Sequence, residues 1–238
     1  MRHVRVLTAL AGVVLALSAC GSGDGDDSSS ETKSDPFKGL TAQQILDKAT
    51  KAAGDAKSVH MKGEIKEEDS TFNIDMAIEE GKGADGTISA EGQEIQLRQI
   101  GKTLYIKGGP VAELAPSLKD KWIKAEGDSA DEFNDITSMD KVFEDMLKPE
   151  GKIEIVAGKE IDGKQTVGLK DAAGSDGKTD DKGILYISKE GPAYPLLIES
   201  TGTSGGLSFV EWNESIDVKA PAKGDTVTEK EAQEAAKG

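Results

Sequence analysis

The sequence is poor in the residues that build disulfides, metal sites and nucleic-acid interfaces. It has one cysteine, Cys20, and two histidines, His3 and His60, among 238 residues, too few for a disulfide scaffold or a Cys/His cluster for zinc or iron. Aromatic residues make up 4% of the chain, which leaves few rings for stacking on bases. The 44 acidic residues outnumber the 29 basic ones, so the formal net charge is −15. We therefore expect no nucleic-acid partner, no metal ion and no cofactor.

The N-terminal residues have the features of an export signal. Two arginines precede an apolar run over residues 6–17, which is shorter than the roughly 20 residues that cross a bilayer as a helix, so we expect it to be cleaved. The four residues LSAC at 17–20 resemble the bacterial lipobox, in which the cysteine receives a diacylglyceryl group and the chain is cut before it. We predict a signal peptide over 1–19, cleavage between Ala19 and Cys20, and a lipid anchor on Cys20 that holds the exported protein at the outer face of the cell membrane.

Composition divides the rest of the chain into three parts. Residues 20–39 are rich in Ser, Gly and Asp and lack apolar periodicity, so we expect a flexible tether. Residues 40–221 contain the periodic segments and are expected to form one domain. Residues 222–238 are expected to be a C-terminal tail, with a weak Ala-rich helix from Thr228.

Two segments show helical periodicity. Thr41 and Gln44 form a capping-box signature in front of apolar residues at helical spacing, which predicts a helix over 41–53. A second helix is predicted over 139–147 and ends before Pro149. Its apolar stripe consists of Met139, Val142, Phe143, Met146 and Leu147. The stripe is more typical of core packing, and the alternative is a methionine-rich cover over an acyl-chain cavity.

Most other segments alternate between apolar and polar residues, which is typical of half-buried strands. We predict strands over 59–66, 72–79, 88–90, 95–97, 104–106, 122–123, 153–155, 167–169, 184–187, 196–198, 207–212 and 216–218. The predicted fold is α+β: a curved antiparallel sheet of about ten strands, covered on its apolar face by a few helices.

The alternation also assigns side chains to the two faces of the sheet. On the apolar face we place Phe72, Ile74, Met76, Ile95, Leu97 and Leu104. On the water-facing side we place Asn73, Asp75, Gln96 and Arg98. A shift of one residue in any strand would reverse its assignment.

Three segments resemble catalytic or ligand-binding motifs, but the residues around each of them, or their spacing, do not fit that function. The GKGADG segment at 81–86 matches GxGxxG, but a strand pattern rather than a helix follows it, so we predict a hairpin turn. The GTSGG segment at 202–206 lacks a base, because His60 lies at a polar strand position. The acidic loop at 171–183 does not have EF-hand spacing. We predict no catalytic residue.

The order of features resembles that of a known family. A lipobox, a polar tether, an N-terminal helix, a first strand VHMKGEI at 59–65, a meander, central helices and the segment LYISKEGPAYPLLIES at 185–200 follow one another. In this order the chain is similar to the LppX/LprG-type envelope lipoproteins of actinobacteria, within the LolA-like lipid-carrier superfamily. The resemblance implies an open half-barrel whose apolar face and covering helices enclose acyl chains.

Together these features predict a non-catalytic lipoprotein that binds the acyl chains of a lipid or lipoglycan for transport or presentation. The expected ligand-binding residues are the six apolar-face residues named above, with Met139, Val142, Phe143 and Met146 of the second helix. The alternative is an envelope sensor or assembly module that binds a protein partner by strand addition. A hydrolase is disfavoured, since no base accompanies a nucleophile.

Overall fold

The computed structural model describes residues 35–67, 70–109, 115–131, 133–149, 151–171, 183–199 and 205–237. The chain divides into two units, Met1–Ser34 and Asp35–Gly238, and every described residue belongs to the second. The predicted signal peptide, including Ala19 and Cys20, lies outside the described residues. So do most of the GTSGG segment and the greater part of the acidic loop.

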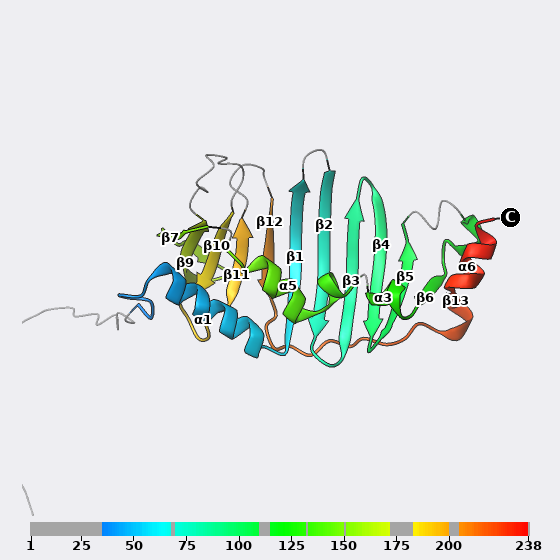
Figure 1. Ribbon diagram of the computed structural model, residues 1–238, viewed down its shortest axis with the longest axis horizontal. Coiled ribbons are helices and arrows are strands. Elements are labelled where there is room, and N and C mark those ends of the chain that lie inside the picture. Colours follow the sequence, from blue (N-terminus) through cyan, green and yellow to red (C-terminus); the bar gives the residue numbers. More distant parts are fainter. Residues whose placement is uncertain are drawn as a thin grey trace, which may run out of the picture. The chain divides into compact units, whose positions relative to one another are not determined.

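The described residues of this unit form one open sheet of thirteen strands (Figure 1). The strands are β1 (Ser58–Glu67), β2 (Ser70–Glu79), β3 (Gly83–Ala90), β4 (Gln93–Ile100), β5 (Thr103–Gly108), β6 (Trp122–Ala125), β7 (Ile153–Val156), β8 (Glu160–Ile161), β9 (Lys164–Asp171), β10 (Ile184–Ser188), β11 (Pro195–Glu199), β12 (Gly206–Val210) and β13 (Thr226–Thr228). Their order is β13-β6-β5-β4-β3-β2-β1-β12-β11-β10-β9-β7, with β8 paired to β9 beside this path. Neighbours are antiparallel except β13 and β6. Among the described strands the two ends, β13 and β7, do not pair, so the sheet is not closed.

The first five strands form the meander that the alternation predicts. Consecutive strands pair along nearly their whole length, from β1 with β2 to β4 with β5. The GKGADG segment begins in the predicted hairpin turn between β2 and β3, with Gly81 and Lys82 in the turn and residues 83–86 already in β3, so it is not a phosphate-binding loop in front of a helix. Its first glycine, Gly81, has a φ of +71°, a conformation that favours glycine.

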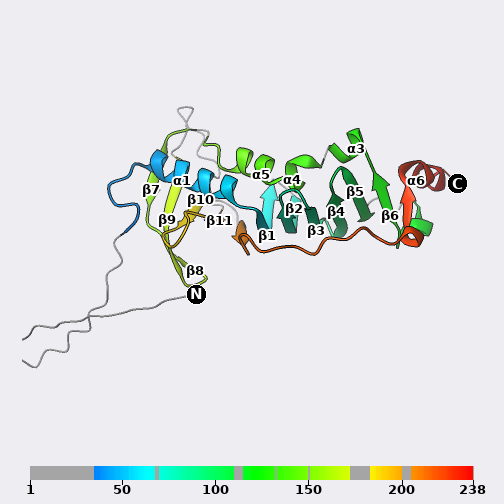
Figure 2. The same ribbon diagram turned by 90° about the horizontal axis from the view of Figure 1, so that it is seen from below.

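The helices that cover the sheet all lie on one of its faces, which we call the helix face (Figure 2). They are α1 (Ala42–Asp55), α3 (Asp128–Asp131), α4 (Asn134–Thr137) and α5 (Met139–Met146). The predicted capping box is confirmed, since the Gln44 backbone N–H donates to the Thr41 hydroxyl and the Thr41 N–H donates to the Gln44 side chain. α1 buries Ile45, Leu46 and Ala49 and ends at Asp55, two residues beyond its predicted end.

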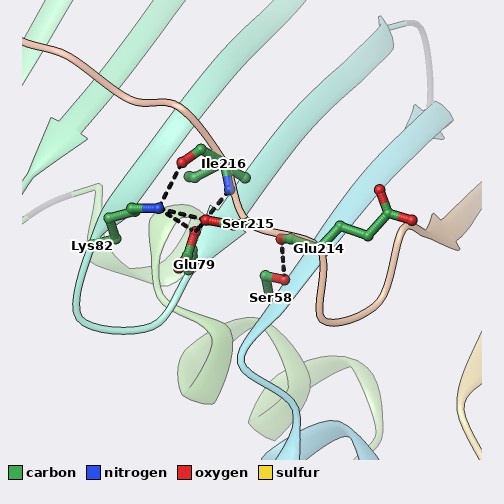
Figure 3. A network of polar contacts seen from close by, with 6 residues as sticks. All are labelled: Ser58, Glu79, Lys82, Glu214, Ser215 and Ile216. Atoms are coloured by element: carbon green, nitrogen blue, oxygen red, sulfur yellow. Dashed lines mark hydrogen bonds and ion pairs between the residues drawn. The ribbon is translucent and has the colours of Figure 1, made fainter.

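Residues 211–222, which we call the strap, run along the opposite face of the sheet (Figure 2). The strand predicted over 216–218 is therefore wrong. The backbone N–H of Ile216 donates to the Glu79 carboxylate (2.8 Å), and Lys82 Nζ donates to the Ile216 carbonyl (2.9 Å), as Figure 3 shows. The backbone N–H and carbonyl of Ile216 are thus hydrogen-bonded to side chains instead of to a neighbouring strand. The alternation of apolar and polar residues at 216–218 therefore does not form a strand.

The predicted tail belongs to the same domain. Its residues form the 3-10 turn η2 (Lys223–Asp225), the strand β13 and the helix α6 (Glu229–Ala235). α6 buries Ala232 against Ile123 of β6 and against Leu118 in the 3-10 turn η1 (Pro116–Leu118). Eleven of the twelve predicted strand segments are strands among the described residues. The two strands that were not predicted, β8 and β13, have only two and three residues, too short to show an alternation.

Candidate functional site

The apolar face predicted for the meander is the helix face. Cross-strand registers place Ile74 of β2 opposite Ile88 of β3, and Ile88 opposite Ile95 of β4, so these side chains form one row. The neighbouring rows on the same face contain the other predicted residues, Phe72, Met76, Leu97 and Leu104. The shared face of the six residues is therefore confirmed, while their contact with a ligand stays a prediction.

Burial changes along the strands of this face. In β2, Ile78 is 2% exposed and Met76 is fully buried, whereas Ile74 and Phe72 are only half-buried. The same change occurs in the neighbouring strands, where Ile88, Ile95 and Ile106 are half-buried while Leu97 and Leu104 are buried. One end of the helix face is thus a packed core. The other end keeps large apolar side chains in partial contact with solvent, where an apolar ligand would gain burial.

β3 presents small side chains to this face. Ala84, Gly86 and Ala90 lie on it together with the large Ile88. A Cβ atom on Gly86 would lie 2.2 Å from the Asp75 carbonyl oxygen, so this position requires glycine. Between the larger residues of β2 and β4, β3 therefore forms a strip of low side-chain volume.

The predicted helical stripe over 139–147 packs onto the helix face. Met139, Val142, Phe143 and Leu147 are buried, and Met146 is half-buried. Figure 1 shows α5 lying across β12, β1 and β2. The Phe143 ring lies 5.3 Å from that of Phe209 and 5.4 Å from that of Trp212, measured between centroids. The stripe is therefore part of the core, and Met146 is its half-buried member.

The opposite face is polar, as predicted. Its registers place Asn73, Asp75, Gln96 and Arg98 away from the helices. The Arg98 guanidinium forms two hydrogen bonds with Asp85, at 3.2 and 3.0 Å. A groove of about 440 Å³ lies between this face and the strap. Its walls include His60, Asp75, Arg98, Trp122 and Ile216.

His60 lies in this polar groove between two carboxylates. Its Nε2 is 2.5 Å from Asp75 Oδ1, and its Nδ1 is 2.8 Å from Glu211 Oε2. Burial alone would raise the pKa of Asp75, but the hydrogen bond and charge of His60, together with Lys62, lower it below its ordinary value. His60 therefore takes part in an ion-pair cluster on the polar face.

A smaller hollow of about 200 Å³ lies at the packed end of the helix face. It is bounded by the end of α1 and the start of α5, and Ala53, Ile78 and Met139 contribute apolar walls. Its rim is polar, with Gln99 and Thr137 among its residues. The packed end thus retains a small opening between the two covering helices.

Within the described ranges, no group of three or more His, Cys, Asp or Glu side chains is arranged to hold a metal ion. No helix in that part of the chain is long and apolar enough to cross a membrane.

The sequence prediction of the site omitted three residues. Ile88 and Ile106 lie in predicted strands, and their own alternation assigns them to an apolar side, but only the register places Ile88 opposite Ile74 and Ile95, and Ile106 opposite Leu97. Trp212 was placed at the end of a predicted strand, whereas β12 ends at Val210. No pattern in the sequence indicates that its ring packs against the central helix.

Comparison with known proteins supports the fold. No family model matches the sequence, and no curated protein matches it. LprF from Mycobacterium bovis superposes with a TM-score of 0.54 at 18% identity, over 76% of this chain and 97% of LprF. The lipoprotein LppX from Mycobacterium tuberculosis gives a TM-score of 0.48 at 14% identity, over 75% and 98%. A LolA superfamily protein from Nitrosomonas europaea gives 0.26 at 13%, over 76% and 96%. This chain therefore has the fold of LprF.

Proposed function

We propose that this protein is an envelope lipoprotein that binds the acyl chains of a lipid or lipoglycan on its helix face, for transport or presentation. The observation that carries the proposal is the half-buried row of Ile74, Ile88 and Ile95, with Phe72 beside it. The proposed role is binding without a chemical reaction. Cys20, modified with a diacylglyceryl group, would anchor the chain to the outer face of the cell membrane.

The half-buried row fits an acyl chain in chemistry. Its side chains are branched aliphatic groups and one aromatic ring, with no charged group among them. Burial of about 15 methylenes at about 0.8 kcal/mol each gives a gross gain of about 12 kcal/mol. Ordering of the chain and the loss of its free motion remove a large part of this gain. An apolar contact of this kind binds tightly without polar recognition of a headgroup.

The central helices contribute half-buried apolar side chains to the same core cluster as this row. Met146 of α5, Ile136 of α4 and Phe133 between α3 and α4 are half-buried and pack against the same core cluster. Methionine adapts its shape to different ligands because its side chain is unbranched and flexible. We place an acyl chain between these residues and the row on the sheet.

Extraction of bound lipid tests this function. We expect mass spectrometry of an organic extract of the purified chain to detect acyl lipids. Ile95→Trp fills the proposed site and should lower the amount several-fold. Gln96→Trp adds the same side chain one residue later, on the polar face, and should retain wild-type lipid. A wild-type chain without acyl lipid, or equal losses in both variants, would contradict the proposal.

The second candidate function is binding of an envelope protein by strand addition, and one observation favours it. β7 is the end strand of the sheet, and Ile155 within it is 49% exposed, the large apolar side chain most open to solvent among the described residues. An exposed strand edge can pair with an extended partner. A chain without acyl lipid, whose β7 amides become protected from hydrogen exchange in the native envelope, would favour this alternative.

A further inference from the structure

The end of β12 contains a break in the alternation of side chains. Val210 lies opposite His60 in the register, so it belongs to the polar face. The next residue should point to the helix face, but Glu211 has a φ of +53° and its carboxylate also contacts His60. Trp212 consequently lies on the helix face, against Phe209 and Phe143. The left-handed conformation of Glu211 therefore decides on which face the indole lies.

Trp212 in turn contacts α5. Its ring lies 5.4 Å from Phe143 of α5 and stacks on Tyr194 at 4.5 Å, with 5° between the planes. Its indole N–H donates to the Pro195 carbonyl (3.2 Å). The indole thus links α5 to the sheet beside the β10–β11 connection.

A glutamate at positive φ is unfavourable by itself. Glu211 is stabilised by the turn hydrogen bond that the Glu214 backbone N–H donates to its carbonyl (3.2 Å) and by the contact of its carboxylate with His60, whose side chain is 16% exposed. Both ring nitrogens of His60 lie within 2.8 Å of a carboxylate oxygen. A neutral imidazole has one N–H and can donate to one of them, whereas an imidazolium donates to both. The arrangement therefore matches the charged form.

Other charged groups surround this histidine. Asp75 of β2 also forms an ion pair with Lys62 of β1, with 3.6 Å between Oδ2 and Nζ. The same groove contains Asp85 of β3, Arg98 of β4 and Asp217 of the strap. Arg98 and Asp85 are paired with each other, and Asp217 is paired with Lys219.

We propose that His60 and Glu211 form a clasp that holds Trp212 against α5, so that loss of this contact loosens the helical cover. The clasp regulates the site on the other face of the sheet, and its consequence for ligand release rests on the proposed function. Removal of the imidazole takes away the contact that holds the Glu211 carboxylate on the polar face. The cover over the acyl site then opens more readily.

Tryptophan fluorescence tests the clasp without any ligand. In the full chain with Trp122→Phe, the remaining indole is Trp212. In this parent we expect the indole to be protected from quenching by acrylamide. In the same background, quenching of Trp212 in His60→Gln and in Glu211→Gln should be several-fold stronger than in the parent. Lys62→Gln removes a charge from the same cluster without contacting Glu211, so quenching of Trp212 in this variant should equal that in the parent.

Hydrogen exchange and a fluorescent acyl probe complete the test. Loss of a charge-assisted hydrogen bond should lower the protection of the α5 amides by about tenfold in His60→Gln. The dissociation of NBD-labelled palmitate should accelerate by a similar factor. If the probe binds but quenching, exchange and dissociation are the same in His60→Gln and wild type, the clasp is refuted and the proposed function stands. If quenching and exchange change while no variant binds the probe, the clasp is supported and the proposed function fails.

Discussion

Ile88 of β3 lies directly opposite Ile95 of β4, and both side chains are half-buried. Two residues further along β4, Leu97 lies opposite Gly86 and is 1% exposed. A single strand therefore contributes to a packed part and to an open part of the same apolar face. The two parts should differ in their response to added volume, because overpacking is costly where no space is left.

The first prediction compares two tryptophan substitutions in β4. Leu97→Trp should lower the free energy of unfolding by about 1–3 kcal/mol, because the new ring must displace packed neighbours. Ile95→Trp should cost clearly less, since its site is open on one side. Urea denaturation of both variants measures the difference. Equal losses at the two positions would mean that the open end is packed as tightly as the core.

The second prediction concerns acid and the strap. Hydrogen bonds from the Ile216 backbone N–H, from Lys82 and from Ser215 hold the pKa of Glu79 below its ordinary value. Since the pKa is lowered in the folded state, the stabilisation is complete above the unfolded value of about 4.3 and is lost as the pH falls through the folded value. Acid should therefore release the strap.

Glu79→Gln tests this contribution. We expect the variant to be less stable than wild type near neutral pH and to lose less stability between about pH 5 and pH 3, the range in which ordinary glutamates titrate. Glu80→Gln, at the adjacent exposed glutamate, is the matched control and should keep the acid dependence of the wild type. Urea midpoints measured across this range give the comparison. The same acid slope in both variants would contradict the role of Glu79.

The third prediction concerns the membrane anchor. Cys20→Ala removes the thiol that a diacylglyceryl group would modify, so the mutant should remain unprocessed or be released from the membrane. Membrane fractionation and electrophoretic mobility measure the two effects. A mutant that stays membrane-bound at the wild-type level with unchanged mobility would exclude the lipobox interpretation.

Local sequence patterns predicted much of the fold. The capping box of Thr41 and Gln44, the helical stripe from Met139 and the hairpin at Gly81 depend on neighbouring residues, and all three are present. The alternation in β2 and β4 gave the correct face for each side chain. These features follow from backbone geometry over a few residues, which explains why the sequence alone sufficed.

Features that depend on distant contacts were not predictable in the same way. The alternation at Ile216 indicated a strand, but its backbone groups are satisfied by Glu79 and Lys82, more than 130 residues away in sequence. The extent of burial at Met76 and Ile74 depends on where α5 lies, and alternation alone assigns both to one face. The place of Trp212 depends on one positive φ at the preceding residue.

Methyl NMR with a spin-labelled fatty acid tests the central claim most directly. In the full chain with isotope-labelled isoleucine methyl groups, doxyl-labelled stearate should broaden the signals of Ile74, Ile88 and Ile95, relative to the same chain with unlabelled stearate. Ile155 at the sheet edge and Ile216 on the strap provide internal controls and should stay sharp. Broadening confined to these two controls, or no broadening at any isoleucine, would contradict an acyl-binding site on the helix face.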